Sequence, residues 1–515
     1  MSIVWGIRWD RRTHATVLAL VAGLVAAFSL HAGSAPAGAP ANTTVIVRGN
    51  AAAEQAIVRA GGTVDKNLKP LGMFVARVPA DSVAALRKAP GVSNVVKDSA
   101  VKMLEESAPA SPVTTTLSDV RAAVNDNGSG AGVDVALIDS GTVPVAALGG
   151  TVIGPDFSSD AGDSQLRGMD SFGHGTHIAG IITGNDPASG FAGVAPASRV
   201  ISLKVAATDG STSLSRILSA MTWAVQHKTD DGRNIRVMNM SLGFRPESAY
   251  VNDVLSYATE QVWKYGITVV VSAGNAGATT SGLDSPAYDP FVIAVGADDL
   301  NGTSDAGDDT VPTWSSKAAD GRGPDVVAPG RAIVSLRVPG SYLDVNHPGG
   351  RYSDTLFRGS GTSQAAGVVS GAAAVLIAKR PSLTPDQVKA LLTRTADQTA
   401  ADASAAGAGR INIGAATAAA VPSGTRQEFR AAQFPSEYLK SLQGDKRSKN
   451  PAIGANGSLW NGSLWNGSLW SGSLWNGSLW SGSLWSGSLW NGSLWSGSLW
   501  SGSLWSTYVD PTDAP

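Results

Sequence analysis

A serine in the last third of this 515-residue chain stands where a side chain could act as a nucleophile. Ser363 lies at the junction between a Gly/Ser-rich loop that begins at Gly359 and an Ala/Val-rich stretch that is typical of a helix. Free backbone N–H groups point outward at the start of a helix, so a hydroxyl group there lies beside donors for an oxyanion. Serine is also an ordinary N-cap residue, and Ser363 alone therefore indicates only a helix start.

Three other polar residues complete a set that could do acyl-transfer chemistry. Asp139 follows a run of apolar residues predicted to be a strand, and ligands bind beyond the carboxyl ends of strands in open α/β sheets. His174 opens a predicted helix and could act as a general base. Asn275 follows another predicted strand, and its amide could donate to an oxyanion together with the Ser363 N–H.

The histidines also allow a metal-binding interpretation, because His174 and His177 lie three residues apart at the start of the same helix. The chain contains no cysteine and no His-Glu-x-x-His segment that would supply further ligands. We therefore predict no metal at this site, a base role for His174 and a structural role for His177. The Asp298-Asp299 and Asp308-Asp309 pairs are predicted to be solvated turns. The chemistry needs no cofactor, and a structural calcium ion cannot be read from the sequence.

The order of the residues along the chain narrows the class of enzyme. An α/β-hydrolase needs its acid and histidine after the nucleophilic serine, whereas here the last histidine, His347, precedes Ser363. The order Asp139, His174, Ser363 is the order found in subtilisin. The chain resembles the subtilase family of serine peptidases from about residue 117 to 420, on motifs listed here in chain order: Asp139-Ser-Gly141, His174-Gly-Thr-His-Ile-Ala-Gly180, Gly193-Val-Ala-Pro196, Ser241-Leu-Gly243, Ser272-Ala-Gly-Asn275, Ala328-Pro-Gly330 and Gly361-Thr-Ser-Gln-Ala-Ala366.

The resemblance implies a serine endopeptidase that hydrolyses peptide bonds through an Asp139-His174-Ser363 triad and an acyl-enzyme. It implies that Asn275 lines the oxyanion hole and that Ser241, Leu242 and Gly243 bind a protein or peptide substrate as an added strand. The serine motif departs from the family pattern in two places, at Gln364 (usually Met) and Gly367 (usually Pro). Neither change removes a catalytic atom. An inactive member of the fold, serving as an envelope or adhesion protein through its Trp-rich tail, is the alternative function.

The elements expected to position these residues form an α/β domain over residues 117–420. Strands are predicted at 133–138, 200–205, 235–240, 267–271 and 291–295, and helices at 175–183, 214–228, 247–265 and 363–379. Apolar β-branched strands that alternate with helices indicate a mostly parallel sheet with helices on both faces.

A smaller α+β unit precedes this domain at residues 43–103, with predicted strands at 44–48, 73–78 and 92–97 and helices at 52–61 and 80–89. This pattern resembles a ferredoxin-like module. By family resemblance it would be an inhibitory propeptide, the chain's own intramolecular inhibitor. Residues 104–116 contain a Pro/Ala/Ser-rich stretch that would form the processing linker.

The N-terminal residues are typical of a protein that is secreted. Residues 1–41 have the basic, apolar and small-residue order of a signal peptide, with an uncleaved anchor as the alternative. We therefore expect a secreted or extracellular protein that could also associate with the cell surface. A formal net charge of −2 offers no case for a nucleic-acid partner.

A linker at 421–455 leads to ten Asn/Ser-Gly-Ser-Leu-Trp repeats at 456–505 and a tail at 506–515. A period of five matches neither a strand nor a helix. Three hypotheses stay open for this low-complexity segment: a module that binds glycans or the cell envelope, a β-solenoid, and a disordered tail.

Overall fold

A computed structural model of the chain describes residues 41–103, 114–425 except 127, 247–249, 278–281 and 320–321, and residue 427. The predicted signal peptide, most of the processing linker, nearly all of the 421–455 linker, the repeats and the tail lie outside the described residues. Among the residues that are described, we find no helix with the length and apolar character that a membrane span requires.

The first described unit is a small domain with its own core. Its antiparallel sheet has the strand order β2-β3-β1-β4, built from β1 (Asn42–Gly49), β2 (Thr63–Leu68), β3 (Met73–Pro79) and β4 (Val92–Lys97). The helices α2 (Ala51–Arg59) and α3 (Val83–Leu86) complete the strand-helix-strand-strand-helix-strand order expected for a split βαβ module. Sequence inspection missed β2 because its residues are polar and mostly exposed, which leaves no apolar alternation to detect.

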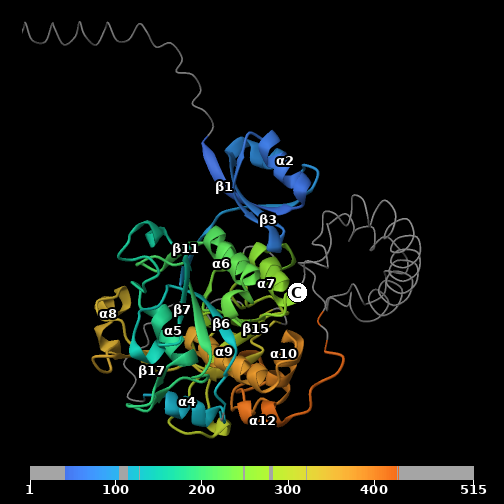
Figure 1. The fold of residues 1–515 in the computed structure, drawn as a ribbon. Helices are drawn as coiled ribbons and strands as arrows, with labels where there is room; N and C mark the ends of the chain where they lie inside the picture. Colours follow the sequence, from blue (N-terminus) through green and yellow to red (C-terminus); the bar gives the residue numbers. More distant parts are fainter. Residues whose placement is uncertain are drawn as a thin grey trace, which may run out of the picture.

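The large domain is built on a seven-stranded sheet in which every strand pair is parallel (Figure 1). In spatial order the strands are β16 (Val326–Pro329), β15 (Ile293–Asp298), β14 (Thr268–Ser272), β12 (Ile235–Met240), β6 (Asp134–Asp139), β10 (Arg199–Lys204) and β7 (Val152–Asp156). The predicted parallel α/β sheet is confirmed. The edge strands β7 and β16 were not predicted from the sequence. Both are short, and each ends at or beside a proline.

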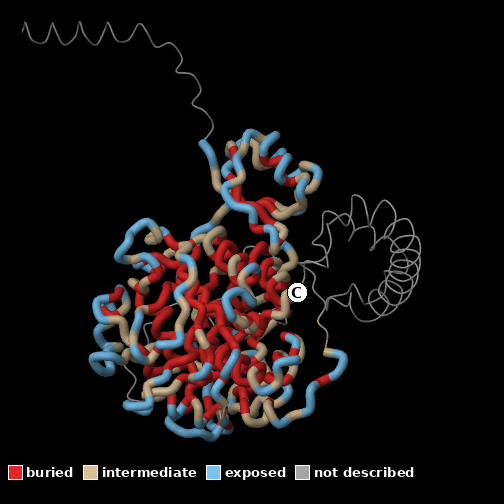
Figure 2. The backbone as a smooth tube through the Cα atoms, viewed as in Figure 1, coloured by how far each residue is buried: buried red, intermediate tan, exposed pale blue. Residues whose placement is uncertain are grey.

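Two helical layers cover this sheet. The helices α5 (His174–Thr183) and α9 (Thr362–Lys379) pack against each other, and α6 (Leu214–Gln226) packs against α7 (Val254–Lys264). Residues 362–377 of α9 are all buried, which its small Ala, Gly and Val side chains permit because they let neighbouring backbones approach closely (Figure 2). This burial fixes the helix that carries Ser363.

Two predicted helix limits need correction. The helix predicted at 247–265 begins only at Val254, because Asp253 caps it by accepting hydrogen bonds from the N–H groups of Leu255 and Ser256. The helix predicted at 80–89 is a 3₁₀ turn followed by the four-residue α3. A further helix, α10 (Pro385–Arg394), begins after Thr384, with a capping box between Thr384 and Gln387.

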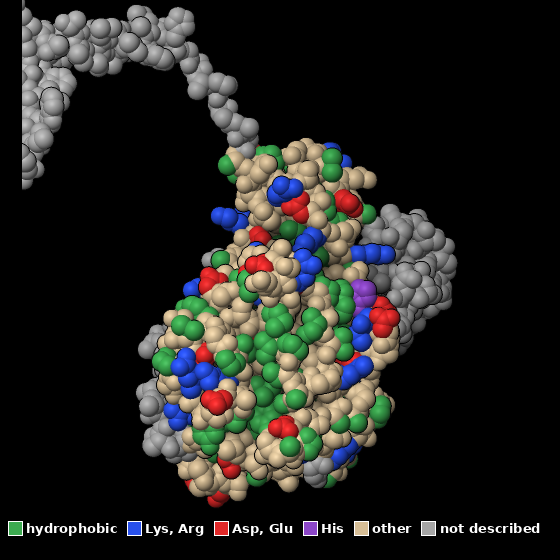
Figure 3. Space-filling model, turned by 60° about the vertical axis from the view of Figure 1, so that its left-hand side comes forward, with side chains coloured by type: hydrophobic (Ala, Val, Ile, Leu, Met, Phe, Trp, Pro, Cys, Tyr) green, Lys and Arg blue, Asp and Glu red, His purple; other side chains and the backbone are tan. Residues whose placement is uncertain are grey.

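The small domain rests on the α6 and α7 side of the large domain (Figure 1). In the space-filling view the two domains meet along a continuous surface, with Lys and Arg side chains near the junction (Figure 3). Beyond β4, the chain continues into β5 (Ala100–Met103), which belongs to neither main sheet.

Candidate active site

Asp139 and His174 form a buried pair at the carboxyl edge of the large sheet. Asp139 is the last residue of the central strand β6, and His174 is the first residue of α5. The His174 Nδ1 atom lies 2.8 Å from Asp139 Oδ1 and 3.0 Å from Oδ2. The exposed fraction is 3% for His174 and 0% for Asp139. A carboxylate in this position fixes the imidazole ring and its tautomer, so that Nε2 is left to exchange protons.

Ser363 lies in the first turn of α9 and is fully buried. Its Oγ atom is 3.5 Å from the carbonyl oxygen of Ser241, and its own carbonyl oxygen accepts a 3.2 Å hydrogen bond from Ser241 Oγ. Ser241 directly follows β12 and Asp139 ends β6, so Ser363 and His174, which contact them, lie at the same edge of the sheet. The structure thus brings together two helices that lie far apart in the sequence.

Asn275 is held in an orientation that suits an oxyanion donor. Its Oδ1 atom accepts hydrogen bonds from the Thr362 N–H at 3.0 Å and from Thr362 Oγ1 at 2.9 Å. With the oxygen side of the amide fixed in this way, the Nδ2 group is buried and finds no acceptor among the described residues. An unpaired buried donor is costly, and such a group next to a candidate nucleophile indicates a ligand atom that arrives later. Sequence inspection had missed the orienting role of Thr362.

The segment predicted to bind substrate already pairs with another strand. β13 (Leu242–Gly243) and β11 (Ser211–Ser213) flank β5 in a three-stranded antiparallel sheet. Met103 lies opposite Leu242, and Lys102 lies opposite Gly243. The Met103 N–H also donates to the Gly210 carbonyl oxygen at 3.1 Å. An extended stretch of the chain, β5, thus lies between two segments of the large domain and pairs with both.

His177 does not belong to a metal centre that the structure describes. Its side chain is buried, and burial together with the nearby His174 lowers the pKa of His177 to about 3, so the ring is neutral. Within the described residues, no group of three or more His, Cys, Asp or Glu side chains could hold a metal ion. The backbone carbonyl oxygen of His177 accepts a hydrogen bond from Ser335 Oγ, which agrees with a structural role for this residue.

The expectation of solvated turns at the paired aspartates is wrong for three of the four residues. Asp298, Asp299 and Asp309 are 1%, 6% and 0% exposed. Asp309 accepts a 2.6 Å hydrogen bond from Arg410, which is itself buried. Asp298 is the last residue of β15. The sequence predicted this strand, but it did not predict that Asp298 lies buried at the carboxyl edge of the sheet.

This buried acidic pair predicts a pH-dependent stability. Burial raises the pKa of Asp309 to about 6, and burial together with the Asp309 charge raises the pKa of Asp298 well above its usual value. Because the unfolded pKa is about 3.9, the contribution of Asp309 to folding is fully present below about pH 4 and is lost as the pH rises through about 6, and the contribution of Asp298 has the same sign. We expect Asp298→Asn to raise Tm by a few degrees relative to the unmodified chain at pH 8, with a smaller gain at pH 4.5. Thermal unfolding at both pH values tests this, with exposed Asp308→Asn as the control. An equal Tm change at the two pH values would contradict it.

The fold and the site together define a parallel α/β protein with the parts of a serine hydrolase, and comparisons with known proteins identify its family. A model described as "Subtilase family" matches residues 130–410. The serine protease AprX of Bacillus subtilis is 37% identical over 294 residues, which cover 55% of this chain and 66% of that protein. Subtilisin E of Bacillus subtilis is 32% identical over 362 residues, which cover 68% of this chain and 83% of that protein.

A solved structure gives the same fold. Fervidolysin from Fervidobacterium pennivorans, described as a keratinolytic enzyme related to subtilisin, matches with a TM-score of 0.59 and 24% identity. The match covers 76% of this chain and 63% of fervidolysin, so the chain spans slightly less than two thirds of AprX and of fervidolysin. The chain belongs to the subtilase family of serine endopeptidases, and the family predicted from the sequence motifs is confirmed.

Proposed function

We propose that this chain is a secreted serine endopeptidase, made as a self-processed zymogen, that uses Asp139, His174 and Ser363 as its triad. The observation that carries the proposal is the buried His174–Asp139 contact at the same sheet edge as the nucleophile helix and an oriented, unpaired Asn275 amide. Protein or peptide substrates follow from the family.

The proposed reaction divides the work among these side chains. The Ser363 hydroxyl oxygen attacks the scissile carbonyl carbon while its proton passes to His174 Nε2, and Asp139 stabilises the imidazolium. The Asn275 amide and the Ser363 backbone N–H donate to the oxyanion. His174 then gives the proton to the leaving amine nitrogen as the C–N bond breaks. In the second half of the reaction, water attacks the carbonyl carbon of the acyl-enzyme while its proton passes to His174. The carboxylic acid product leaves as the proton returns to the Ser363 oxygen.

The docking of the small domain supports the zymogen part of the proposal. The helix α6 has no side-chain cap of its own, and Asp98 of the small domain accepts hydrogen bonds from the Ser215 N–H at 2.9 Å and from Ser215 Oγ at 2.6 Å. A carboxylate at a helix N-terminus is favoured by the unpaired N–H groups and by the helix dipole. The Arg48 guanidinium lies 4.6 Å from the centre of the Tyr257 ring on α7, and Lys66 donates to Ser219 on α6. These contacts hold the small domain, from which the chain continues into β5, against the large domain.

The register of β5 predicts where the chain is cut. Met103, the last described residue of β5, lies opposite Leu242, and Ser241 directly precedes Leu242. The Ser241 carbonyl oxygen is 3.5 Å from Ser363 Oγ, so the described part of β5 ends close to the proposed nucleophile. We expect the mature enzyme to begin at Glu105 or within one residue of it.

N-terminal sequencing and intact mass of the mature protein test this prediction. The Ser363→Ala chain, purified from the same host, is the control and should keep the peptide bonds after Met103 intact. A mature terminus beyond Pro112, or the same terminus in the Ser363→Ala chain without any host protease, would contradict self-cleavage at this register.

A further inference from the structure

Asp170 is a buried carboxylate that no step of the proposed mechanism uses. It is 2% exposed and lies on the segment between β7 and α5. Its Oδ1 atom accepts hydrogen bonds from the Gly173 N–H at 2.7 Å and from Ser140 Oγ at 2.8 Å, and its Oδ2 atom accepts one from the Thr176 N–H at 2.7 Å. Burial raises the pKa of Asp170, and these hydrogen bonds oppose the rise. The carboxylate thus contacts both sequence segments that supply the Asp139–His174 pair.

On the histidine side, Asp170 takes the place of a capping residue. The N-cap position of α5 is Gly173, whose φ of 104° suits glycine and which has no side chain to cap the helix. Asp170 instead satisfies two N–H groups of the first turn, those of Gly173 and Thr176. His174 is between them. The position of its backbone therefore depends on this carboxylate.

On the aspartate side, Ser140 makes the link. Its backbone N–H donates to Asp139 Oδ1 at 2.8 Å, and its hydroxyl oxygen accepts the Gly175 N–H at 2.9 Å. The single hydroxyl proton has two acceptors, Asp170 Oδ1 at 2.8 Å and Asp139 Oδ1 at 3.3 Å, and the distances favour Asp170. Asp170 thereby orients the Ser140 hydroxyl group and leaves its lone pairs for the α5 backbone.

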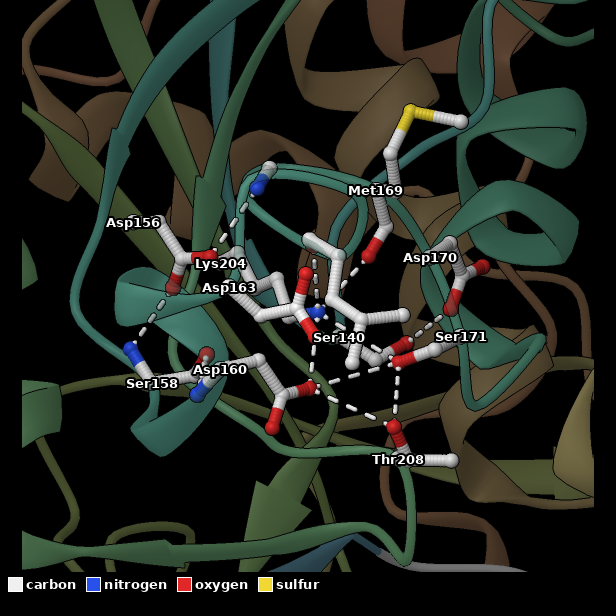
Figure 4. A network of polar contacts seen from close by, with 12 residues as sticks. Ser140, Asp156, Ser158, Asp160, Asp163, Met169, Asp170, Ser171, Lys204 and Thr208 are labelled. Carbon is white, nitrogen blue, oxygen red and sulfur yellow. Dashed lines mark hydrogen bonds and ion pairs between the residues drawn. The ribbon is translucent and has the colours of Figure 1, made fainter.

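The segment that carries Asp170 is itself fixed by a buried ammonium group (Figure 4). Lys204 is 1% exposed, and its Nζ atom donates to the Met169 carbonyl oxygen at 2.7 Å, the Leu166 carbonyl oxygen at 3.1 Å and Asp160 Oδ2 at 3.1 Å. Lys204 ends β10 directly opposite Asp139 on β6. The residue before Asp170 is therefore tied to the strand beside Asp139, which leaves Asp170 little freedom to shift.

We propose that Asp170 is a positioning residue that, through Ser140 and the first turn of α5, holds the His174 ring against Asp139 in the position from which its Nε2 atom can exchange a proton with Ser363. Asp170 makes no contact with the reacting atoms in this account. The inference rests on the proposed triad, because it assigns Asp170 the task of aligning two of its members.

Kinetics of Asp170→Asn in the full chain test the proposal. The amide keeps the size of the side chain but removes its charge and one acceptor oxygen. Because a misplaced catalytic group costs up to about 100-fold, we expect kcat on a peptide substrate to fall by about 10- to 100-fold with KM within about twofold. The acid limb of the kcat/KM profile should also move to lower pH, because loss of a nearby negative charge destabilises protonated His174.

Asp156→Asn is the matched control. Asp156 is the last residue of β7, at the start of the segment that leads to Asp170, and it likewise accepts two backbone N–H bonds, from Ser158 and Gly168, but it bonds neither motif segment. It should leave kcat and the acid limb unchanged even if Tm falls. Equal losses in Asp170→Asn and Asp156→Asn, or an Asp170→Asn enzyme with unchanged kcat and acid limb, would overturn the proposal.

If Asp170→Asn does not fold, Ser140→Ala decides the question. That variant keeps the Asp139 contact from its backbone N–H and removes only the hydroxyl link, so kcat should fall about 10-fold with KM unchanged. An unchanged kcat would overturn the proposal. Failure of the triad itself would show differently, as an unmodified chain that hydrolyses no peptide and takes no label at Ser363.

Discussion

Replacing Ser363 with alanine should leave the chain uncut after Met103 and without peptidase activity. The hydroxyl oxygen is the atom proposed to attack both the substrate and the chain's own peptide bond, and no other serine lies at the start of the buried helix α9. Loss of the corresponding serine in subtilisin lowers kcat by about 10⁶-fold, and we expect a loss of that order here. Peptide hydrolysis and intact mass, measured on the same preparation, give both results.

Two variants serve as controls for this prediction. His174→Ala should match Ser363→Ala, because members of a triad act as a unit and their losses do not add. Ser370→Ala removes another buried hydroxyl on α9, one that bonds Asn239, and should leave the chemistry intact. Processing of the Ser363→Ala chain at the usual position in a preparation free of other proteases would contradict the proposed nucleophile.

Replacing Asn275 with alanine should lower kcat by about 100- to 1,000-fold, the range known for this type of oxyanion donor in subtilisin, with little change in KM. The reason lies in the timing of the hydrogen bond. The Asn275 Nδ2 group is buried without an acceptor in the described residues, and in the proposed mechanism its hydrogen bond strengthens as charge develops on the substrate oxygen. Steady-state kinetics on a peptide substrate would separate kcat from KM.

Thr362 provides the matched control for Asn275. Its hydroxyl group holds the amide oxygen at 2.9 Å and also accepts the Gly274 N–H at 3.2 Å. Thr362→Val should therefore give a smaller loss of kcat, because the Thr362 N–H still anchors Asn275. A rise in KM with kcat unchanged in Asn275→Ala would instead show that the amide binds the ground state.

Much of the site could be predicted because its members stand at the ends of regular elements. Asp139 and Asn275 follow apolar strands, and His174 and Ser363 open helices, so local sequence patterns locate them. The parallel sheet was also predictable from local patterns, because apolar strands alternate with helices along the chain. What local patterns cannot give is contact between segments far apart in sequence. Thr362 and Asp170 were missed because each acts on a neighbour through a hydrogen bond that no spacing rule records.

Burial of charge was the other property that the sequence did not show. Asp298 and Asp309 look like ordinary turn residues, and only the packing of Arg410 from the end of the domain reveals a closed environment. The placement of β5 is a similar case. Residues 100–103 carry no strong strand pattern, and they become a strand because β11 and β13 supply the hydrogen-bond partners on both sides.

Fluorophosphonate labelling of the mature protein, mapped by peptide mass spectrometry beside the Ser363→Ala chain, tests the central claim most directly. This reagent modifies an activated serine, so we expect a label on Ser363 alone and none on the alanine variant. A mature protein that has lost residues 43–103 and yet takes no label at Ser363 would contradict an active triad.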